Sequence, residues 1–339
     1  MILKEVIMNI GNKKIGKDHP VYIIAEAGIN HNGDLDIAKE MIEEAKKCGV
    51  DAIKIQTIIP EDLFSQKLNP ELFEMCKDWT LDLNQHKELK KHAIKNKIEF
   101  FSTPVGLKST KILRDLGVSA IKIASGDLNN YELIKEASKS TKSLIISTGM
   151  SSISEIMSTV NFIEATDSKF MLLHCISSYP ASIKDANLNT IPYFKTIFNV
   201  PIGYSDHTLG IDTAVTAVAL GASCIEKHFT LDKKMIGPDQ NLSANPHEFK
   251  ELVAKIRLVE NGLGTPRNTT LPSEIKFRKL MRRSIFSTRD LKKGTKLNKS
   301  DLILLRPGNG IHPKMIENLI GMTLIKNVKK GEMLSWKMF

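Results

Sequence analysis

The 339-residue sequence contains little of several residue types and patterns, and each shortage excludes a class of protein. Aromatic residues make up 6%, which leaves little material for the stacking platforms of single-strand nucleic acid binders. The formal net charge is +10, but Lys and Arg occur singly or in pairs such as Lys46-Lys47, with no run of five or more. We therefore expect no nucleic acid partner. The positive charge suits a small anionic substrate or a solvated surface.

Cysteine and long apolar runs are scarce too. The four cysteines (Cys48, Cys76, Cys175 and Cys224) show no CxxC spacing and lie mostly in or beside apolar segments, which is typical of buried, reduced thiols. No apolar run approaches the ~18 residues of a membrane span, and the first twenty residues lack the apolar region and cleavage site of a signal peptide. We expect a cytoplasmic protein without a membrane partner.

One pattern recurs along most of the chain. A short apolar run of β-forming residues is followed by a turn, and then by a segment whose apolar residues repeat with the period of an α-helix. The predicted strands are 21–26, 51–56, 98–103, 120–125, 143–148, 170–175, 200–206 and 222–228. The predicted helices are 35–48, 82–96, 107–116, 131–139, 152–164, 185–198, 209–220 and 246–261. Eight such units predict a (β/α)8 TIM barrel with a parallel sheet. The alternative is a doubly wound open sheet, although no GxGxxG follows the first strand.

The composition of the sequence and its pattern of apolar residues change after residue 261. The stretch "NGLGTPRNTTLPS" (261–273) is rich in Gly, Pro, Thr and Asn, and from about 283 short strand-like pieces alternate with turns such as "KKG" and "GNG". We place the barrel domain at 1–262, a linker at 263–282 and a small, mostly β domain at 283–339. A domain of that size is marginal alone, so we expect it to pack on another surface.

Polar side chains gather where the predicted strands end, which is the catalytic mouth of a barrel. They are Glu26, Lys54, Gln56, Ser102, Thr103, Lys122, Ser125, Ser147, Thr148, His174, Ser205, Asp206, His207, Glu226 and His228. Lys54 and Lys122 interrupt apolar strands, and a buried ammonium is costly unless an anion meets it. They pair either with a buried carboxylate, such as Glu26 or Glu226, or with an anionic ligand. Together with the hydroxyl groups they suit a phosphate and a carboxylate.

Two histidines follow the last two predicted strands, which are neighbours in a closed barrel. His207 and His228 are therefore expected to face each other and share a divalent metal, with Glu26, Asp206, Glu226 and Asp239 as further ligands or orienting groups. The alternative is that each is a hydrogen-bonded structural residue. We interpret His174 as a pocket wall, and His31 as a ligand contact or a cap.

These residues resemble the sialic acid synthase family, the phosphoenolpyruvate-dependent synthases of nine-carbon sugar acids. The matching stretches include "IIAEAGINHNGD" (23–34), "AIKIQT" (52–57), "FSTP" (101–104), "IKIASGD" (121–127), "STGM" (147–150), "HCISSYP" (174–180), "GYSDHTLG" (203–210), "IEKHFTLD" (225–232), "GPD" (237–239) and "RPGNGI" (306–311). They keep order and spacing from about residue 17 to the end. The C-terminal unit resembles the family's antifreeze-like (SAF) domain.

The resemblance implies a role for each site residue. Phosphoenolpyruvate would contact Lys54, Thr103, Lys122, Ser125, Ser147 and Ser205, and His207 and His228 would hold Mn²⁺ or Mg²⁺. Gln56, Tyr179 and Asp239, with Glu26 and Glu226, would surround the amino sugar. Arg306 would reach the neighbouring subunit's site and contact the sugar's acyl group, in a domain-swapped homodimer. Lys54, Lys122, Glu26 and Glu226 would be the catalytic groups.

The implied reaction joins phosphoenolpyruvate to an N-acetylated amino hexose and releases phosphate. N-Acetylmannosamine is the first acceptor we consider. Its 6-phosphate and a 2,4-diacetamido-6-deoxy hexose on the way to legionaminic or pseudaminic acid are the alternatives. Asp127 and Gln240 stand where family members more often carry Glu and His, and Ser177 stands where some sialic acid synthases carry Asn. These departures bear on the sugar more than on the reaction. Two other interpretations are a barrel that makes seven- or eight-carbon keto acids and an inactive barrel that only binds.

Overall fold

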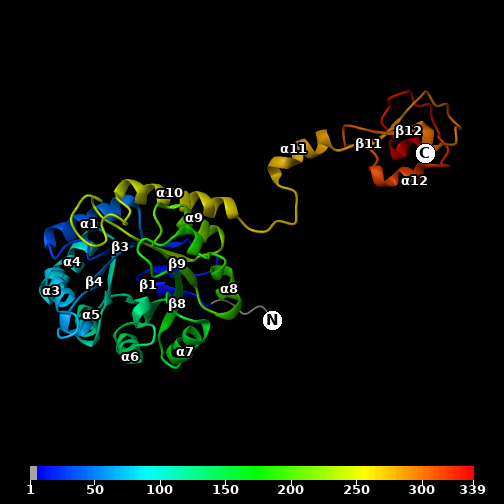
Figure 1. Ribbon diagram of the computed structural model, residues 1–339. Helices are drawn as coiled ribbons and strands as arrows, with labels where there is room; N and C mark the ends of the chain where they lie inside the picture. Colours follow the sequence, from blue (N-terminus) through cyan, green and yellow to red (C-terminus); the bar gives the residue numbers. More distant parts are fainter. Residues whose placement is uncertain (1–5) are drawn as a thin grey trace. The chain divides into compact units, whose positions relative to one another are not determined.

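A computed structural model of the chain describes residues 6–339, which divide into two compact units at the Gly264–Thr265 bond (Figure 1). In the first unit eight parallel strands form a closed barrel in the order β3-β4-β5-β6-β7-β8-β9-β10, with β10 paired back onto β3. The closure confirms the predicted TIM barrel, and it rules out the open sheet because an open sheet has two unpaired edges.

The eight predicted strands are all present. They are β3 (Tyr22–Gly28), β4 (Ala52–Thr57), β5 (Glu99–Pro104), β6 (Ile121–Ile123), β7 (Ser143–Ser147), β8 (Lys169–Cys175), β9 (Ile202–Asp206) and β10 (Cys224–His228). Almost every residue in them is buried, as expected of parallel strands covered by helices on one face and packed side chains on the other.

The eight predicted helices also occur and cover the outside of the barrel (Figure 1). They are α1 (Leu35–Cys48), α4 (Leu83–Lys95), α5 (Leu107–Leu116), α6 (Tyr131–Ser140), α7 (Ile153–Glu164), α8 (Thr190–Ile197), α9 (Asp212–Ala219) and α10 (Pro246–Leu263). Helix α1 illustrates the local signals. Asp34 accepts hydrogen bonds from the first-turn amides of Asp36 and Ile37, and Gly49 ends the helix in the left-handed conformation.

The sequence patterns missed two features of the barrel unit. An antiparallel hairpin of β1 (Met8–Ile10) and β2 (Lys13–Ile15) precedes the barrel, and Met8, Ile10 and Ile15 in it are fully buried. Between β4 and α4 the chain adds α2 (Pro60–Leu63) and α3 (Pro70–Asp78). Each of these elements is too short to carry a clear apolar period.

The second unit has its own core. It contains β11 (Ser284–Ser287), β12 (Leu302–Leu305) and α12 (Ile316–Leu319), and its buried residues include Ile285, Leu297, Leu324 and Leu334. The segment predicted as a linker, 263–282, holds α11 (Pro272–Met281).

The charge of the chain is unevenly divided between the units. Residues 265–339 carry 17 Lys and Arg against 5 Asp and Glu, a net +12, whereas residues 1–264 carry 31 against 33, a net −2. No helix in residues 6–339 is long and apolar enough to cross a membrane.

Candidate functional site

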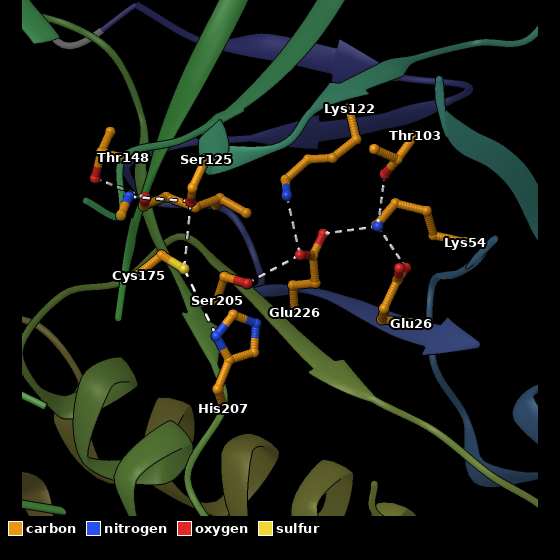
Figure 2. A network of polar contacts seen from close by, with 12 residues as sticks. Glu26, Lys54, Thr103, Lys122, Ser125, Thr148, Cys175, Ser205, His207 and Glu226 are labelled. Atoms are coloured by element: carbon orange, nitrogen blue, oxygen red, sulfur yellow. Dashed lines mark hydrogen bonds and ion pairs between the residues drawn. The ribbon is translucent and has the colours of Figure 1, made fainter. Parts of the chain in front are cut away.

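Two lysines and two glutamates meet inside the barrel (Figure 2). Lys54 of β4 forms an ion pair with Glu26 of β3, and its Nζ lies 3.7 Å from Glu226 Oε2 of β10. The Nζ of Lys122, on β6, lies 3.1 Å from Glu226 Oε1. Each of these four side chains is at most 6% exposed. The lysines therefore pair with Glu26 and Glu226, which is the carboxylate alternative drawn from the sequence.

Hydroxyl groups complete the cluster. Lys54 donates a 2.9 Å hydrogen bond to Thr103 Oγ1, and Ser205 Oγ donates a 2.9 Å hydrogen bond to Glu226 Oε1. Two positive and two negative groups thus share one buried volume with several donors. The charges of the two lysines and two glutamates nearly cancel. An anion that enters the site can therefore replace the glutamates as the ion-pair partner of the lysines.

The two glutamates have opposite protonation tendencies. Burial alone would raise the pKa of Glu226, but the ammonium groups of Lys122 and Lys54 outweigh it and lower the pKa to about 2. Burial raises the pKa of Glu26 to about 7, because Lys54 only partly offsets the loss of water and the nearby Glu226 charge adds to it. Because their pKa values differ, the two carboxyl groups can have different roles at neutral pH.

A second group of small polar residues lies at the ends of β6, β7 and β8. The amide of Gly149 donates a 3.0 Å hydrogen bond to Ser125 Oγ. The hydroxyl oxygens of Ser147 and Ser177 are buried and have no hydrogen-bond partner within residues 6–339. A buried hydroxyl without a protein partner is uncommon in a native protein and marks a place where water or a polar ligand can bind. In the sequence Ser177 stands out only as a departure from the family, and Gly149 does not stand out.

The two histidines face each other, as expected from neighbouring strand ends. The ring centroids of His207 and His228 are 5.4 Å apart, and the ring of Tyr179 lies 4.2 Å from that of His207. His207 Nδ1 is 2.8 Å from the carbonyl oxygen of Ile176. It acts as the donor in that bond, so Nε2 carries the free electron pair, the arrangement typical of a metal-binding imidazole.

These residues fit a divalent ion in part. His228 Nδ1 is buried without a hydrogen-bond partner, and it lies 3.6 Å from Asp239 Oδ2. In the described part of the chain, however, no three His, Cys, Asp or Glu side chains are close enough together to hold a metal ion. The protein therefore offers two imidazole donors, and water or substrate would complete the coordination.

Three residues expected to bind the sugar converge on a glycine. At Gly28, which has a φ of +54°, a β-carbon in place of hydrogen would lie 3.4 Å from Glu26 Oε1, 3.7 Å from Gln56 Nε2 and 3.9 Å from Asp239 Oδ2. The missing side chain leaves room between three polar groups that can bind sugar hydroxyls. Gly28 was not singled out in the sequence, because its role depends on the neighbours that the fold brings together.

The remaining predicted residues occupy different surroundings. His174 Nε2 is 2.7 Å from the carbonyl oxygen of Ala186, and the residue helps to line a cavity of about 690 Å³ beside the ends of β7 and β8. His31 is buried, and its Nδ1 accepts a hydrogen bond from the Gly33 amide. Arg306 lies in the second unit, where its Nε donates to the carbonyl oxygen of Met281.

Comparison with known proteins assigns the chain to a family. Residues 41–268 match the NeuB family and residues 282–339 match the SAF domain. An uncharacterized protein of Methanocaldococcus jannaschii is 48% identical over 97% of both chains. The N,N'-diacetyllegionaminic acid synthase of Legionella pneumophila is 42% identical over 96% of this chain and 97% of its own length.

A solved structure agrees with this assignment. The N-acetylneuraminic acid (sialic acid) synthetase of Leptospira borgpetersenii, in complex with citrate, superposes with a TM-score of 0.77 at 40% identity, covering 81% of this chain and 96% of the other. The chain therefore belongs to the NeuB family, the family of the sialic acid synthases, and it carries that family's barrel followed by a SAF domain.

Proposed function

We propose that this protein condenses phosphoenolpyruvate with an open-chain 2-acetamido hexose, giving a nine-carbon 2-keto sugar acid and inorganic phosphate. One observation carries the proposal: Lys54 and Lys122 are buried in one cluster with Glu26 and Glu226. Such a cluster can exchange its internal ion pairs for those of a small, highly charged anion. Membership of the NeuB family supports the same reaction class.

In the proposed complex the lysines neutralise the carboxylate and phosphate of phosphoenolpyruvate. Hydroxyl groups around them donate the hydrogen bonds that fix its orientation. The contacting residues are Lys54, Thr103, Lys122, Ser125, Ser147 and Ser205, and the unpartnered hydroxyl of Ser177 extends the set. When the phosphate leaves, the same cations stabilise its charge.

The bond that forms is determined by one nucleophilic carbon, in phosphoenolpyruvate, and one electrophilic carbon, in the acceptor. The C3 methylene of phosphoenolpyruvate attacks the aldehyde carbon, a carbon–carbon bond forms, and the aldehyde oxygen takes up a proton to become a hydroxyl. Water adds to the oxocarbenium-like C2 and loses a proton, and the tetrahedral intermediate releases phosphate to leave the 2-keto acid. Glu226 stays ionised and stabilises the positive charge at C2.

Glu26 is the better candidate for the protein group that exchanges protons with water. It lies beside Gln56 and Asp239 around Gly28, at the acceptor end of the site, whereas Glu226 is bound to both lysines. A carboxyl group with a pKa of about 7 can both accept and return a proton at neutral pH.

His207 and His228 would hold a divalent ion, Mn²⁺ or Mg²⁺. Such an ion acts as a Lewis acid toward a carbonyl oxygen. The hydrogen bond from His207 Nδ1 to Ile176 sets the orientation of that ring. Tyr179, packed on His207, would close the site beside the sugar.

The acceptor is an N-acetylated amino hexose, and two versions of it have support. Similarity to the sialic acid synthetase of Leptospira borgpetersenii favours N-acetylmannosamine, and similarity to the legionaminic acid synthase of Legionella pneumophila favours a 2,4-diacetamido-6-deoxy hexose. We further propose a domain-swapped homodimer in which Arg306 of one subunit contacts the acyl group in the other subunit's site.

A substrate panel tests the reaction. The purified protein is incubated with phosphoenolpyruvate, Mn²⁺ and each acceptor in turn, phosphate is assayed, and the product is identified by mass. We expect one acetamido hexose to give stoichiometric phosphate and a nine-carbon acid, and Lys122→Met to abolish both. Lys139→Met, a change on the exposed face of α6, is the matched control. Turnover only with four- or five-carbon aldose phosphates, or no turnover with any acceptor, would refute the proposal.

A further inference from the structure

A buried ion pair lies directly beside the two facing histidines. Lys227 Nζ is 2.8 Å from Asp206 Oδ2, and these side chains are 2% and 0% exposed. Asp206 precedes His207, and Lys227 precedes His228. The two strands also pair Lys227 with Asp206 in register. The ion pair thus joins β9 to β10 one residue before each histidine.

The pair is outside the reaction cluster. The side chain of Glu226 points into the barrel, where it contacts Lys122 and Ser205. Since successive side chains of a strand alternate between faces, Lys227 points outward toward the covering helices. Thr213, in the first turn of α9, contacts Asp206 there with its hydroxyl at 3.1 Å.

Further hydrogen bonds fix the chain on both sides of His207. Asp206 Oδ1 accepts from the amide and the hydroxyl of Thr208, at 2.9 and 2.8 Å. Lys227 Nζ also donates a 2.8 Å hydrogen bond to the Thr208 carbonyl oxygen. The residues immediately before and after His207 are therefore both bound, directly, to the residue that precedes His228.

An arrangement of this kind is not needed for stability alone. A fully buried ion pair is often no more stabilising than apolar side chains of similar volume, whereas it does impose a fixed register on the groups it joins. Here the fixed groups are the two imidazoles. We propose that Asp206 and Lys227 are positioning residues that hold His207 and His228 at the spacing a divalent cation requires. This inference rests on the proposed metal site.

The test measures Mn²⁺ binding directly, without turnover. Free Mn²⁺ is followed by electron paramagnetic resonance during titration of the full chain, and the His207→Ala/His228→Ala variant gives the background. Because a single change leaves an unpaired buried charge and can prevent folding, the main variant is Asp206→Asn/Lys227→Met, which removes both charges together. Lys227→Arg keeps the charge and serves as the conservative variant.

We expect the double variant to bind Mn²⁺ about 10- to 100-fold more weakly, the usual effect of losing groups that orient metal ligands, and Lys227→Arg to bind within about threefold of the wild type. Phosphoenolpyruvate affinity, measured by calorimetry without metal, should be unchanged in both. Lys13→Met/Asp51→Asn is the control for an ion pair lost elsewhere in the barrel, because it removes the pair at the amino end of β4, in which Asp51 is buried and Lys13 is exposed.

Each outcome separates the hypotheses. If the double variant binds Mn²⁺ as tightly as the wild type, whatever its melting temperature, the positioning role is wrong. If the control loses Mn²⁺ affinity to the same extent as the double variant, the effect is a general loss of stability and the positioning role is again wrong. If the wild type binds no more Mn²⁺ than the variant without the two histidines, the metal site itself is wrong, and the inference fails with it.

Discussion

At the scale of single residues, His31 is buried in its neutral form. Burial lowers its pKa to about 4, and the nearby His86 adds to the effect. The ring is 0% exposed, and its Nε2 has no hydrogen-bond partner within residues 6–339. In the unfolded chain the same side chain has an ordinary pKa of about 6.5. The difference makes the free energy of unfolding depend on pH.

We predict that the protein loses stability as the pH falls from about 6.5 to about 4. In that range the unfolded chain binds a proton at His31 that the folded protein does not, so protonation favours unfolding, whereas above pH 6.5 the stability is complete. Between pH 7.5 and pH 5 the loss from this residue is about 2 kcal/mol. Urea unfolding of the wild type and of His31→Gln at both pH values measures it. An equal pH dependence in the two proteins would contradict the prediction.

Gly28 provides a second prediction at this scale. A methyl group there enters the space among Glu26, Gln56 and Asp239, so Gly28→Ala should raise the KM for the acceptor about tenfold or more while leaving the KM for phosphoenolpyruvate unchanged. Gly117→Ala is the control, because Gly117 has a similar φ of +65° and only Lys90 Nζ near it, at 3.7 Å. Equal changes of acceptor KM in both variants would show that backbone strain alone is responsible.

At the scale of elements, the hairpin of β1 and β2 is the feature that was hardest to predict from the sequence. Ile10 is 1% exposed, and Ser143 donates a hydrogen bond to the carbonyl oxygen of Asn9, so the hairpin is fixed against the amino end of β7. It buries apolar side chains at the end of the barrel where the catalytic groups are not.

We predict that Ile10→Ala lowers the free energy of unfolding by roughly 2–5 kcal/mol, the range for a large buried aliphatic side chain, without a change in the KM for phosphoenolpyruvate. Lys14→Ala, an exposed change in the same hairpin, should have little effect. Urea unfolding and steady-state kinetics on the same preparations check both. A loss of substrate affinity with unchanged stability would contradict this assignment.

The barrel was predictable from the sequence because its strands are continuous apolar runs that alternate with amphipathic helices. The polar ends of the strands could be placed at one mouth by the same rule. The sequence offered Glu226 as one of several partners for the buried lysines, but it could not show that Lys122 of β6 pairs with it, because that contact crosses the barrel between strands that are not neighbours. Gly28 escaped because its neighbours Glu26, Gln56 and Asp239 come from β3, β4 and the loop after β10, and Ser177 stood out only as a departure because the burial of its hydroxyl depends on the fold.

At the scale of the whole molecule, our proposal assigns residues of both units to the reaction. The residues proposed to bind phosphoenolpyruvate all precede Gly264, whereas Arg306 belongs to the SAF domain. In a domain-swapped dimer each complete site contains one subunit's barrel and the other subunit's arginine. This arrangement can be tested by combining two inactive variants.

We predict that a mixture of Lys122→Met and Arg306→Ala chains, unfolded and refolded together, recovers activity. Half of the dimers are then mixed, and one of the two sites in each is intact, so about a quarter of the wild-type activity should return. Each variant refolded alone is the control. If every site uses its own chain's arginine, no site is intact and no activity returns.

The connection between the two units has a consequence of its own. Residues 264–269 are exposed and contain no helix or strand, so the SAF domain is held on a short tether. A tether of this length keeps a weakly attracted partner at an effective concentration on the order of 1 mM. In the proposed dimer, however, the tether joins each SAF domain to its own barrel and not to the barrel whose site receives Arg306, so the subunits must stay associated for either site to be complete.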